Sequence, residues 1–490
     1  MANQRNVRGL NVVVLGLARQ GLALSRWLAA QGAQVTASDV QPAEKLPDAL
    51  RALEGLPIRL ELGGHPLSLL DGCDLLCLSG GVPTDLPVVL EARRRGISLS
   101  NDSQLFVERC PATVMGITGS AGKTTTTTLV GEMCRVAGRK TWVGGNIGNP
   151  LIGDLDAIAS SDLVVMELSS FQLELMTSSP PIAAVLNVTP NHLDRHPSME
   201  AYTAAKAHIL DYQSARDTAV LGFDDPVARS LARRVRGALW MFVGDGSRLP
   251  QDWSRLPHAS VREGCVVLAQ DRPPPATRPR PDGPGVGRRA GGRASPGVPV
   301  CLVSDIRLRG DHNLLNVLAA CALASAAGIE PEAMRQAIIE FTGVAHRLQL
   351  VRVRNGVSYY DDSIATAPER LIAALKAFHE PIVLLAGGRD KHLPWDEAAG
   401  LIRQRVRRLI LFGEMAGLVE RAIGNWELGI GSSELEAVHR VNTLAEAVGK
   451  AAEVAQAGDV VLLSPGGTSF DAFQDFAERG DRFQEYVRQL

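Results

Sequence analysis

The sequence predicts an α/β protein built from three domains, on the strength of three observations. Short apolar runs typical of buried strands alternate with stretches that have the apolar spacing of helices. Glycine-rich turns follow several of the apolar runs, as they do at the carboxyl ends of parallel strands. The chain of 490 residues is long enough for about three domains with cores of their own. We expect these domains over residues 1–110, 111–342 and 343–490.

The composition is that of a globular protein without a strong charge bias. A net charge of −2 provides no general attraction to nucleic acid or to anionic membranes. The sequence shows neither an apolar run long enough to span a bilayer nor an N-terminal signal region. Its seven cysteines are scattered and form no CxxC pair, which indicates reduced thiols. We therefore expect a soluble cytoplasmic protein that binds neither nucleic acid nor membrane.

The first domain opens with a βαβ pattern. Asn11–Leu15 is expected to form a strand, Gly16–Gly21 a turn and Leu22–Gln31 a helix. A second strand, Val35–Ser38, precedes Asp39, where an acidic side chain would meet a ribose hydroxyl.

Ala18 stands where the dinucleotide-binding fingerprint has its middle glycine, so the pattern is GxAxxG. An imperfect fingerprint is weak evidence for NAD, but it indicates a domain that binds a pyrophosphate-containing molecule. A further strand, Asp74–Leu78, completes this domain, which ends near Cys110.

The second domain begins with a strand, Thr113–Ile117, then a glycine-rich loop and then a helix over Thr124–Val136. Glycines let backbone N–H groups approach phosphate oxygens, and the amino end of a helix adds positive potential. Lys123 can reach the β- and γ-phosphates, and the Thr124 hydroxyl can ligate Mg²⁺. The position six residues before the lysine is Ile117 rather than the usual glycine, so the pattern predicts nucleotide binding without defining the kind of enzyme.

Two later strands of this domain end in polar residues. Leu163–Leu168 carries Glu167, and Ala183–Val188 is followed by His192 and Asp194. Because ligands bind at the carboxyl ends of parallel strands, these side chains are expected near the same phosphates. A carboxylate and an imidazole there suit a divalent metal ion, although either residue alone is equally consistent with a structural role.

Residues 272–299 are rich in Pro, Gly and Arg and contain almost no large apolar residue. Such a segment cannot bury enough surface to fold, so we expect a disordered loop. Its position between two strand-like runs, Cys265–Ala269 and Val300–Val303, favours a tolerated insertion over a nucleic-acid-binding tail. The third domain, from Gly343, repeats the α/β alternation, and its strands also end in polar or glycine-rich residues.

Motifs from about residue 10 to the C-terminus together resemble the Mur ligase family of peptidoglycan synthesis. They are TGSAGKTT, GGNIGNP, MELSSFQLE, NVTPNHLDRH, AYTAAKAHI, GDHNLLN, GVAHRL, DDSIAT, GGRDK and SPGGTSFDAF. The resemblance implies a Rossmann-like UDP-binding domain, a central P-loop ATPase domain and a C-terminal Rossmann-like domain. It also implies an ATP-dependent ligase that adds D-glutamate to UDP-N-acetylmuramoyl-L-alanine through an acyl phosphate.

The resemblance further implies roles for residues at matching motif positions. Catalysis would involve Lys123, Glu167, His192 and Lys206. ATP would meet Gly119, Gly122, Lys123, Thr124, Thr125, Asn316, Arg347 and Asp362. Two Mg²⁺ ions would be held by Thr124, Glu167, His192 and Lys206, the last as a carbamate formed with CO₂. The UDP-sugar would meet Gly16, Leu17, Asp39, Ser79, Gly80, Asn146 and His192. Glutamate would meet Thr366, Lys391, Ser469 and Phe476.

Two motifs depart from the family pattern near the expected glutamate site. The usual DSKATN is DSIATA here, with Ile364 and Ala367, and the usual SPAxAS is SPGGTS. A variant of the family adds L-glutamate, so the stereochemistry of the amino acid stays open.

Three other readings compete with this one. A folylpolyglutamate-type ligase shares the ATPase but begins close to its P-loop, whereas a βαβ domain precedes the loop here. An NAD-dependent oxidoreductase is disfavoured by Ala18 and by the lack of a second dehydrogenase motif. A non-catalytic nucleotide-binding protein would be expected to lack some of Lys123, Glu167, His192 and Lys206, all of which are present.

Overall fold

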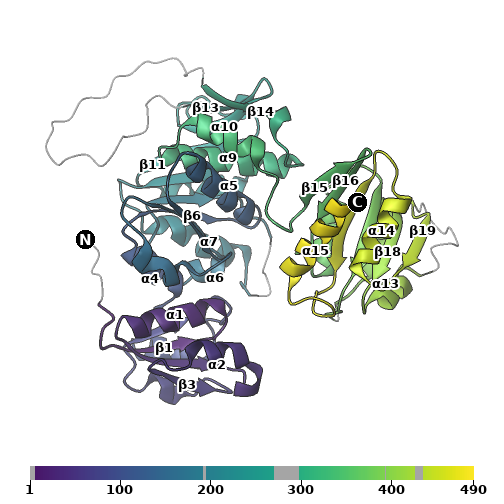
Figure 1. Ribbon diagram of the computed structural model, residues 1–490. Helices are drawn as coiled ribbons and strands as arrows, with labels where there is room; N and C mark the ends of the chain where they lie inside the picture. The colour runs from purple at the N-terminus through teal and green to yellow at the C-terminus, as the bar shows by residue number, and fades with distance from the viewer. Residues whose placement is uncertain (1–5, 191–194, 270–296, 392, 425–433) are drawn as a thin grey trace. The chain divides into compact units, whose positions relative to one another are not determined.

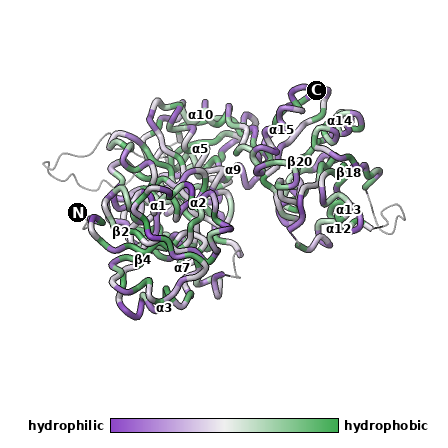
Figure 2. Tube along the Cα trace, turned by 60° about the horizontal axis from the view of Figure 1, so that its bottom comes forward, coloured by the Kyte–Doolittle hydropathy of each residue, from purple (hydrophilic) through white to green (hydrophobic). Residues whose placement is uncertain are grey.

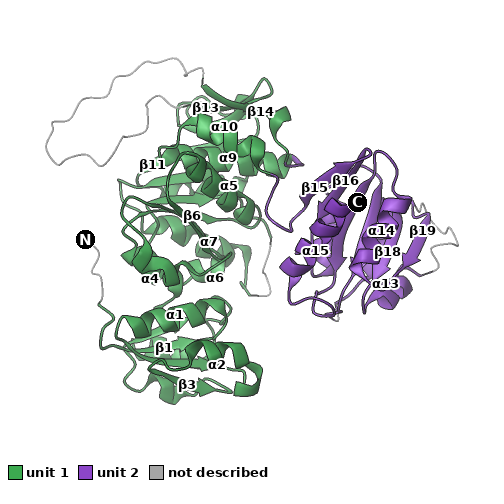
Figure 3. Cartoon of the chain, in the orientation of Figure 1, with its two compact units in different colours: residues 1–307, 311–341 green, residues 308–310, 342–490 purple. Residues whose placement is uncertain are grey.

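Strands alternate with helices along most of the described chain, and most neighbouring strands pair in parallel (Figure 1), which confirms the α/β class. The computed structural model describes residues 6–190, 195–269, 297–391, 393–424 and 434–490. The chain divides into two units, coloured separately in Figure 3. Unit 1 comprises residues 1–307 and 311–341, and unit 2 comprises residues 308–310 and 342–490.

The N-terminal part of unit 1 is a parallel sheet with the strand order β3-β2-β1-β4-β5. Its strands are β1 (Asn11–Leu15), β2 (Gln34–Asp39), β3 (Ile58–Leu62), β4 (Leu75–Leu78) and β5 (Ser98–Ser100). Its helices are α1 (Arg19–Ala30), α2 (Pro47–Leu53), α3 (Pro87–Arg94) and α4 (Asp102–Arg109). Val12 and Val14 of β1 pack in one core with Leu24 and Leu28 of α1, which explains the alternation of apolar residues in the strand.

The first helix begins earlier than the sequence predicts. A turn is expected over Gly16–Gly21, but α1 starts at Arg19, so Gly21 lies inside the helix. A Cβ on Gly21 would lie 1.7 Å from the carbonyl oxygen of Gly16. Gly21 therefore allows the helix to pack closely on the preceding turn, and only Gly16 has the positive φ of a turn glycine, +88°.

The remainder of unit 1 is a mixed sheet with the order β14-β13-β12-β11-β10-β9-β6-β8-β7. Its strands are β6 (Thr113–Thr118), β7 (Thr141–Gly145), β8 (Leu163–Glu167), β9 (Ile182–Val185), β10 (Thr218–Gly222), β11 (Ala238–Val243), β12 (His258–Arg262), β13 (Cys265–Ala269) and β14 (Val298–Leu302). Its helices are α5 (Lys123–Val136), α6 (Ser170–Leu173), α7 (Met199–Asp211), α8 (Pro226–Ser230), α9 (Asp311–Ala326) and α10 (Pro331–Glu340). The strand expected over Ala183–Val188 is shorter than predicted, because β9 ends at Val185.

Strand β6 lies between β8 and β9 and pairs in parallel with both. Its carboxyl end therefore lies beside the carboxyl ends of two neighbours, the geometry in which α/β sheets bind ligands. At the far edge, β12, β13 and β14 pair antiparallel, so the segment between β13 and β14 leaves and re-enters the sheet at adjacent positions.

Unit 2 contains a sheet with the order β15-β16-β20-β17-β18-β19. The strands are β15 (Gln349–Arg354), β16 (Val357–Asp361), β17 (Ile382–Gly387), β18 (Val406–Phe412), β19 (Ala437–Arg440) and β20 (Val460–Gly466). The helices are α11 (Pro368–Leu375), α12 (Asp396–Arg405), α13 (Ala416–Ile423), α14 (Leu444–Val454) and α15 (Phe476–Gln489). Strand β15 pairs antiparallel with β16, and the other neighbours pair in parallel.

The sheet of unit 2 has an apolar core on each face. Leu384 and Leu462 pack with residues of α11, α12 and α13, whereas Leu385 and Leu463 pack with residues of α14 and α15. Strands β17 and β20 are thus covered on both faces, as parallel strands usually are. Figure 2 shows that hydrophobic and hydrophilic stretches alternate along the chain. Within the described ranges, no helix is long and apolar enough to cross a membrane.

Candidate active site

The loop between β6 and α5 is shaped by close contact with α9. Gly122, the residue before α5, has a φ of +82°, a conformation that favours glycine. A Cβ on Gly122 would lie 2.1 Å from Oδ1 of Asn316 on α9, so a larger residue would collide with that side chain. Thr125, in the first turn of α5, is buried. The structure thus brings together Gly122 and Asn316, two residues expected at the ATP site from distant parts of the sequence.

Two lysines converge on one oxygen of this loop. The Nζ of Lys123 and the Nζ of Lys206, from α7, each donate to the carbonyl oxygen of Gly119 at 3.0 Å. The amino end of α5 adds positive potential at the same place. Together these groups form a site that favours an anion such as the phosphates of a nucleotide.

The surroundings of Lys206 weaken its ordinary preference for the charged form. Only 1% of the residue is exposed. Burial first, and the charge of Lys123 second, lower the pKa of Lys206 to about 7, while the carboxylate of Glu167 opposes the shift. A large fraction of this amine is therefore neutral near pH 7 and available as a nucleophile.

Glu167 connects the loop to the next strand. Its Oε2 accepts a hydrogen bond from the Thr124 hydroxyl at 2.9 Å, and its Oε1 accepts one from Asn146 Nδ2 at 2.8 Å. The backbone N–H of Asn146 also donates to the carbonyl oxygen of Glu167 at 2.9 Å. Since β6, β8 and β7 are neighbours, their carboxyl ends place these three side chains together.

The oxygen atoms at this position are suitable ligands for a hard divalent cation. A buried carboxylate and a hydroxyl 2.9 Å apart are the oxygen ligands that Mg²⁺ prefers. No group of three or more His, Cys, Asp or Glu side chains arranged for a metal occurs among the described residues. His192, predicted as a further metal and substrate residue, lies outside the described residues, and so does Asp194.

The expected UDP site in the N-terminal sheet is built around Asp39, at the end of β2. Asp39 Oδ2 accepts from the backbone N–H of Leu17 at 2.7 Å, and Oδ1 accepts from that of Gln41 at 2.8 Å. A Cβ on Gly16 would lie 2.9 Å from a methyl carbon of Val82. The carboxylate thus holds the turn after β1 in place, a structural role beside the ribose contact that the sequence suggests.

The turn after β4 lies beside the same site. Ser79 is buried, and the backbone N–H of Gly80 donates to Gln20 Oε1 at 3.0 Å. Further along this loop, the Thr84 hydroxyl donates to Glu174 Oε1 at 2.9 Å. A cavity of about 750 Å³ lies next to this hydrogen bond and is lined by the loop together with α6 and α7. Its volume is in the range of small-molecule sites.

Asp362 follows β16 in unit 2 and is almost fully buried. Its Oδ2 accepts from the Ser464 hydroxyl at 2.9 Å, and its Oδ1 accepts from the backbone N–H of Leu348 at 3.2 Å. Burial raises the pKa of Asp362 to about 7, although these hydrogen bonds and the charge of Arg347 act in the opposite direction. Arg347 and Asp362, both expected to bind ATP, therefore belong to one electrostatic cluster within unit 2.

The residues expected to bind glutamate lie on loops after neighbouring strands. Lys391 Nζ donates to the Thr366 hydroxyl at 3.1 Å, which confirms that these two residues lie together. Ser469 is buried and directly follows Thr468, whose backbone exchanges two hydrogen bonds of 2.9 Å with Arg389. The loops after β16, β17 and β20 thus form one continuous rim of unit 2.

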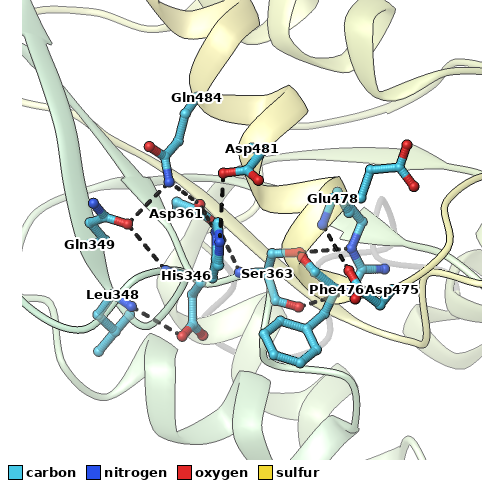
Figure 4. A network of polar contacts seen from close by, with 12 residues as sticks. His346, Leu348, Gln349, Asp361, Ser363, Asp475, Phe476, Glu478, Asp481 and Gln484 are labelled. Carbon is cyan, nitrogen blue, oxygen red and sulfur yellow. Dashed lines mark hydrogen bonds and ion pairs between the residues drawn. The ribbon is translucent and has the colours of Figure 1, made fainter. Parts of the chain in front are cut away.

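Phe476, the fourth expected glutamate residue, begins α15 beside a buried polar network (Figure 4). Its ring lies edge-on to that of His346, with 6.3 Å between centroids. His346 Nδ1 is 2.8 Å from Asp361 Oδ2, which also accepts from Gln484 Nε2 at 2.9 Å. Burial alone would lower the pKa of His346, but this hydrogen bond and the carboxylates around it raise the pKa above the ordinary 6.5.

Several residues that shape the site are not expected from the sequence. They include Gln20, Tyr202, His346, Ser363 and Arg479. Their contacts join segments far apart in the chain, such as Arg479 and Ser363, so local patterns give no signal for them. Gly480 is the one feature of the sequence that indicates tight packing near Arg479, because a glycine inside a helical pattern often marks a close contact.

Three family models match the chain in sequence order. They are the MurD-like N-terminal domain of Mur ligases over residues 10–101, the Mur ligase middle domain over residues 117–252, and the Mur ligase glutamate ligase domain over residues 346–467. These matches show that the chain belongs to the Mur ligase family. The glycine-rich loop before α5, the two lysines at Gly119 and the three sheets described above agree with this assignment. The expectation of a three-domain Mur ligase architecture is confirmed.

Curated relatives extend the similarity over nearly the whole chain. The UDP-N-acetylmuramoylalanine–D-glutamate ligase of Symbiobacterium thermophilum is 44% identical, covering 97% of this chain and 97% of the relative. The ligase of the same name from Acetivibrio thermocellus is 38% identical, covering 99% and 98%.

Solved structures with similar folds are also Mur ligases. The UDP-N-acetylmuramate–alanine ligase of Thermotoga maritima matches 98% of this chain and 99% of its own, with a TM-score of 0.52 and 18% identity. A UDP-N-acetylmuramoyl-L-alanyl-D-glutamate–2,6-diaminopimelate ligase matches 99% and 94%, with a TM-score of 0.54 and 16% identity. At such identities the similarity supports the fold alone.

Proposed function

We propose that this protein is an ATP-dependent ligase that joins D-glutamate to UDP-N-acetylmuramoyl-L-alanine, forming a peptide bond in peptidoglycan precursor synthesis. The observation that carries the proposal is the cluster at the carboxyl ends of β6, β7 and β8. There, Lys123 and Lys206 donate hydrogen bonds to the carbonyl oxygen of Gly119, and Thr124 and Asn146 donate hydrogen bonds to Glu167. The two relatives named above, which carry this activity in their names, support the choice of substrates.

The reaction begins with transfer of the γ-phosphoryl group of ATP to an oxygen of the alanyl carboxylate, which releases ADP. The glutamate amine then attacks the carbonyl carbon of the acyl phosphate, the C–O bond to phosphate breaks, and the amine loses a proton. Both partners in the first step are anionic, so the positive groups around Gly119 lower the repulsion between them. Lys123 is the residue placed to hold the transferred phosphoryl group, together with the amino end of α5.

Mg²⁺, which Mur ligases generally use with ATP, would supply charge neutralisation of the phosphates. In this proposal Thr124, Glu167, His192 and a carbamate on Lys206 would hold two ions. The buried, partly neutral amine of Lys206 supports the carbamate, because CO₂ reacts with the uncharged amine.

The substrates are assigned to the three proposed domains, 1–110, 111–342 and 343–490. The UDP-sugar is assigned to Gly16, Leu17, Asp39, Ser79, Gly80, Asn146 and His192. ATP is assigned to Gly119, Gly122, Lys123, Thr124, Thr125, Asn316, Arg347 and Asp362. Glutamate is assigned to Thr366, Lys391, Ser469 and Phe476. A cation and hydroxyls on the rim of unit 2 suit a dicarboxylate amino acid. We also propose that the enzyme acts as a monomer in the cytoplasm without nucleic-acid or membrane partners.

The proposal is tested by phosphate release from ATP with Mg²⁺ and UDP-N-acetylmuramoyl-L-alanine, measured separately with D-glutamate and L-glutamate. Turnover with D-glutamate alone is expected. Turnover with L-glutamate alone would keep the ligase reaction but overturn the stereochemistry, and Ile364 and Ala367 would then be the first residues to exchange. No turnover with either isomer would contradict the choice of substrates. Lys123→Met is the matched inactive control and should reduce turnover by at least about a hundredfold.

A further inference from the structure

The loops assigned to glutamate need an element that sets their spacing. Thr366 lies after β16, Lys391 after β17 and Ser469 after β20, and β20 pairs with both other strands. Beyond the ends of the strands, the regular hydrogen bonds of the sheet no longer hold the chains apart at a fixed distance. The geometry of this rim therefore depends on a few backbone bonds, such as those between Arg389 and Thr468, and on side chains that contact more than one loop.

One buried guanidinium contacts two of these loops. Arg479, on α15, is fully buried. Its Nε donates to the Ser363 hydroxyl at 3.0 Å and its Nη2 to the Ser363 carbonyl oxygen at 2.9 Å, both in the loop after β16. Its Nη1 donates to the carbonyl oxygen of Gly467 at 3.1 Å, in the loop after β20. A planar group with donors in fixed directions thus joins the two loops.

The third loop, which follows β17, also lies close to the Arg479 side chain. A Cβ on Gly388, in the loop after β17, would lie 2.9 Å from Arg479 Nη1 and 2.1 Å from the carbonyl oxygen of Thr468. The glycine therefore permits the close approach of this loop to the guanidinium. Within the described part of the chain, no carboxylate forms an ion pair with Arg479, so directional hydrogen bonds to the loops account for its contacts.

Ser363 and α15 fix the position from which Arg479 acts. The Ser363 hydroxyl donates to the carbonyl oxygen of Phe476 at 2.7 Å, which ties the loop after β16 to the first residue of α15 (Figure 4). A Cβ on Gly480 would lie 2.0 Å from His346 Nδ1 and 2.8 Å from Asp361 Oδ2. The amino end of α15 is therefore packed tightly against β16, and the guanidinium has one defined location.

We infer that Arg479 is a positioning residue for glutamate binding. Its guanidinium holds the loops that carry Thr366 and Ser469 at the spacing the amino acid needs, without touching the amino acid itself. The inference rests on the proposed function of those two residues. Lysine at this position would keep the positive charge but could not donate in a fixed fork to Ser363 and Gly467.

The test is steady-state kinetics of Arg479→Lys in the full chain, with all three substrates varied in turn. We expect the KM for D-glutamate to rise roughly tenfold or more, because small displacements of positioning groups have large effects. The KM for the UDP-sugar, assigned to unit 1, should stay within about twofold, a split that general destabilisation would not produce. Arg352→Lys is the matched control, since Arg352 also donates to carbonyls of α15, those of Val487 and Arg488, away from these loops.

Ser363→Ala provides a second variant in case Arg479→Lys does not fold. It removes one acceptor of Arg479 and the hydrogen bond to Phe476, and should raise the KM for D-glutamate by about threefold. In the double variant the two effects should be less than multiplicative, because both act through one contact. Equal KM changes for all substrates, or a D-glutamate KM unchanged in both variants, would overturn the inference. A wild-type enzyme inactive with D-glutamate would instead contradict the proposed function.

Discussion

Lys206 illustrates how surroundings decide the chemistry of a residue. A lysine on a helix is normally solvated and charged, but this one is buried beside Lys123 and an aromatic ring. Both burial and the neighbouring cation disfavour the ammonium form, whereas a carbamate would reverse the charge and convert repulsion from Lys123 into attraction. The site is thus suited to a lysine that is modified before it functions.

The first prediction concerns the pH dependence of stability at this position. The pKa of Lys206 is about 7 in the folded protein, against an ordinary 10.5. Between these values the unfolded chain binds the proton and the folded protein does not, so the contribution of Lys206 to stability increases with pH. Below pH 7 the full cost of burying the charge is present. Lys206→Met should therefore stabilise the protein by up to a few kcal/mol at pH 6, and by less at pH 9.

Urea unfolding in bicarbonate-free buffer at both pH values measures this difference. Lys45→Met is the control, because Lys45 is exposed and its replacement should change stability little at either pH. Lys206→Met should also be inactive as a ligase. A stabilisation that is equal at pH 6 and pH 9 would show that Lys206 is not held near neutrality in the folded protein.

Among the elements, the turn into α5 places a strict demand on the sequence. Gly122 combines a positive φ with contact to Asn316. Gly138, just after the same helix, has a φ of +73°, but a Cβ on this residue would have no atom within 4 Å. Gly122→Ala and Gly138→Ala therefore share the backbone strain, about 1–2 kcal/mol each. Only the first also displaces Asn316.

The second prediction follows from this comparison. Both variants should lose about 1–2 kcal/mol of unfolding free energy, with a larger loss for Gly122→Ala. Only Gly122→Ala should weaken ATP binding, by roughly tenfold, because the loop and Asn316 move. Calorimetric titration with a non-hydrolysable ATP analogue and urea unfolding measure the two effects. Equal nucleotide affinity in both variants would contradict a role for the Gly122–Asn316 contact.

The sequence predicts elements better than contacts in this protein. Buried parallel strands such as β6 and β8 are continuous apolar runs, and the glycine-lysine-threonine turn has few alternative structures, so the sequence predicts both within a residue or two. The predicted start of α1 is wrong, because Gly21 looks like a turn residue when its neighbour in space is unknown. Arg479 gives no signal at all, since its partner Ser363 lies 116 positions away and both occur in ordinary local patterns.

For the whole molecule, the segment between β13 and β14 lies between the residues matched by the middle-domain model and those matched by the glutamate ligase model. Leu268 pairs with Val298 and Val266 with Cys301, so the two strands form a hairpin at the edge of the sheet. Leu268 and Val298, which flank the intervening segment, are therefore held close together by the fold itself. The free energy of closing a loop depends only weakly on its length, which explains how the sheet accommodates this one.

The third prediction is that the segment can be removed. Replacing residues 270–296 by a short glycine-containing hairpin turn should leave kcat and all KM values unchanged. Stability should rise by about 1–2 kcal/mol, because the shorter loop costs less entropy to close. Thermal unfolding and the phosphate-release assay measure both properties. A control of equal length, with Arg and Pro replaced by Gly and Ser, separates length from composition. Loss of activity in the shortened protein would reveal a function for the segment.

The burial of four cysteines has a practical consequence for following this enzyme at work. All seven thiols are free, and burial raises the pKa of Cys134 and Cys301 to about 12 and that of Cys77 and Cys321 as well. Since maleimide dyes react with thiolates, these four buried thiols will label slowly. A single surface cysteine introduced into each unit would label much faster. Once the half-buried Cys73, Cys110 and Cys265 are replaced by serine, dyes on these two sites would report, by fluorescence energy transfer, whether substrates change the distance between the units.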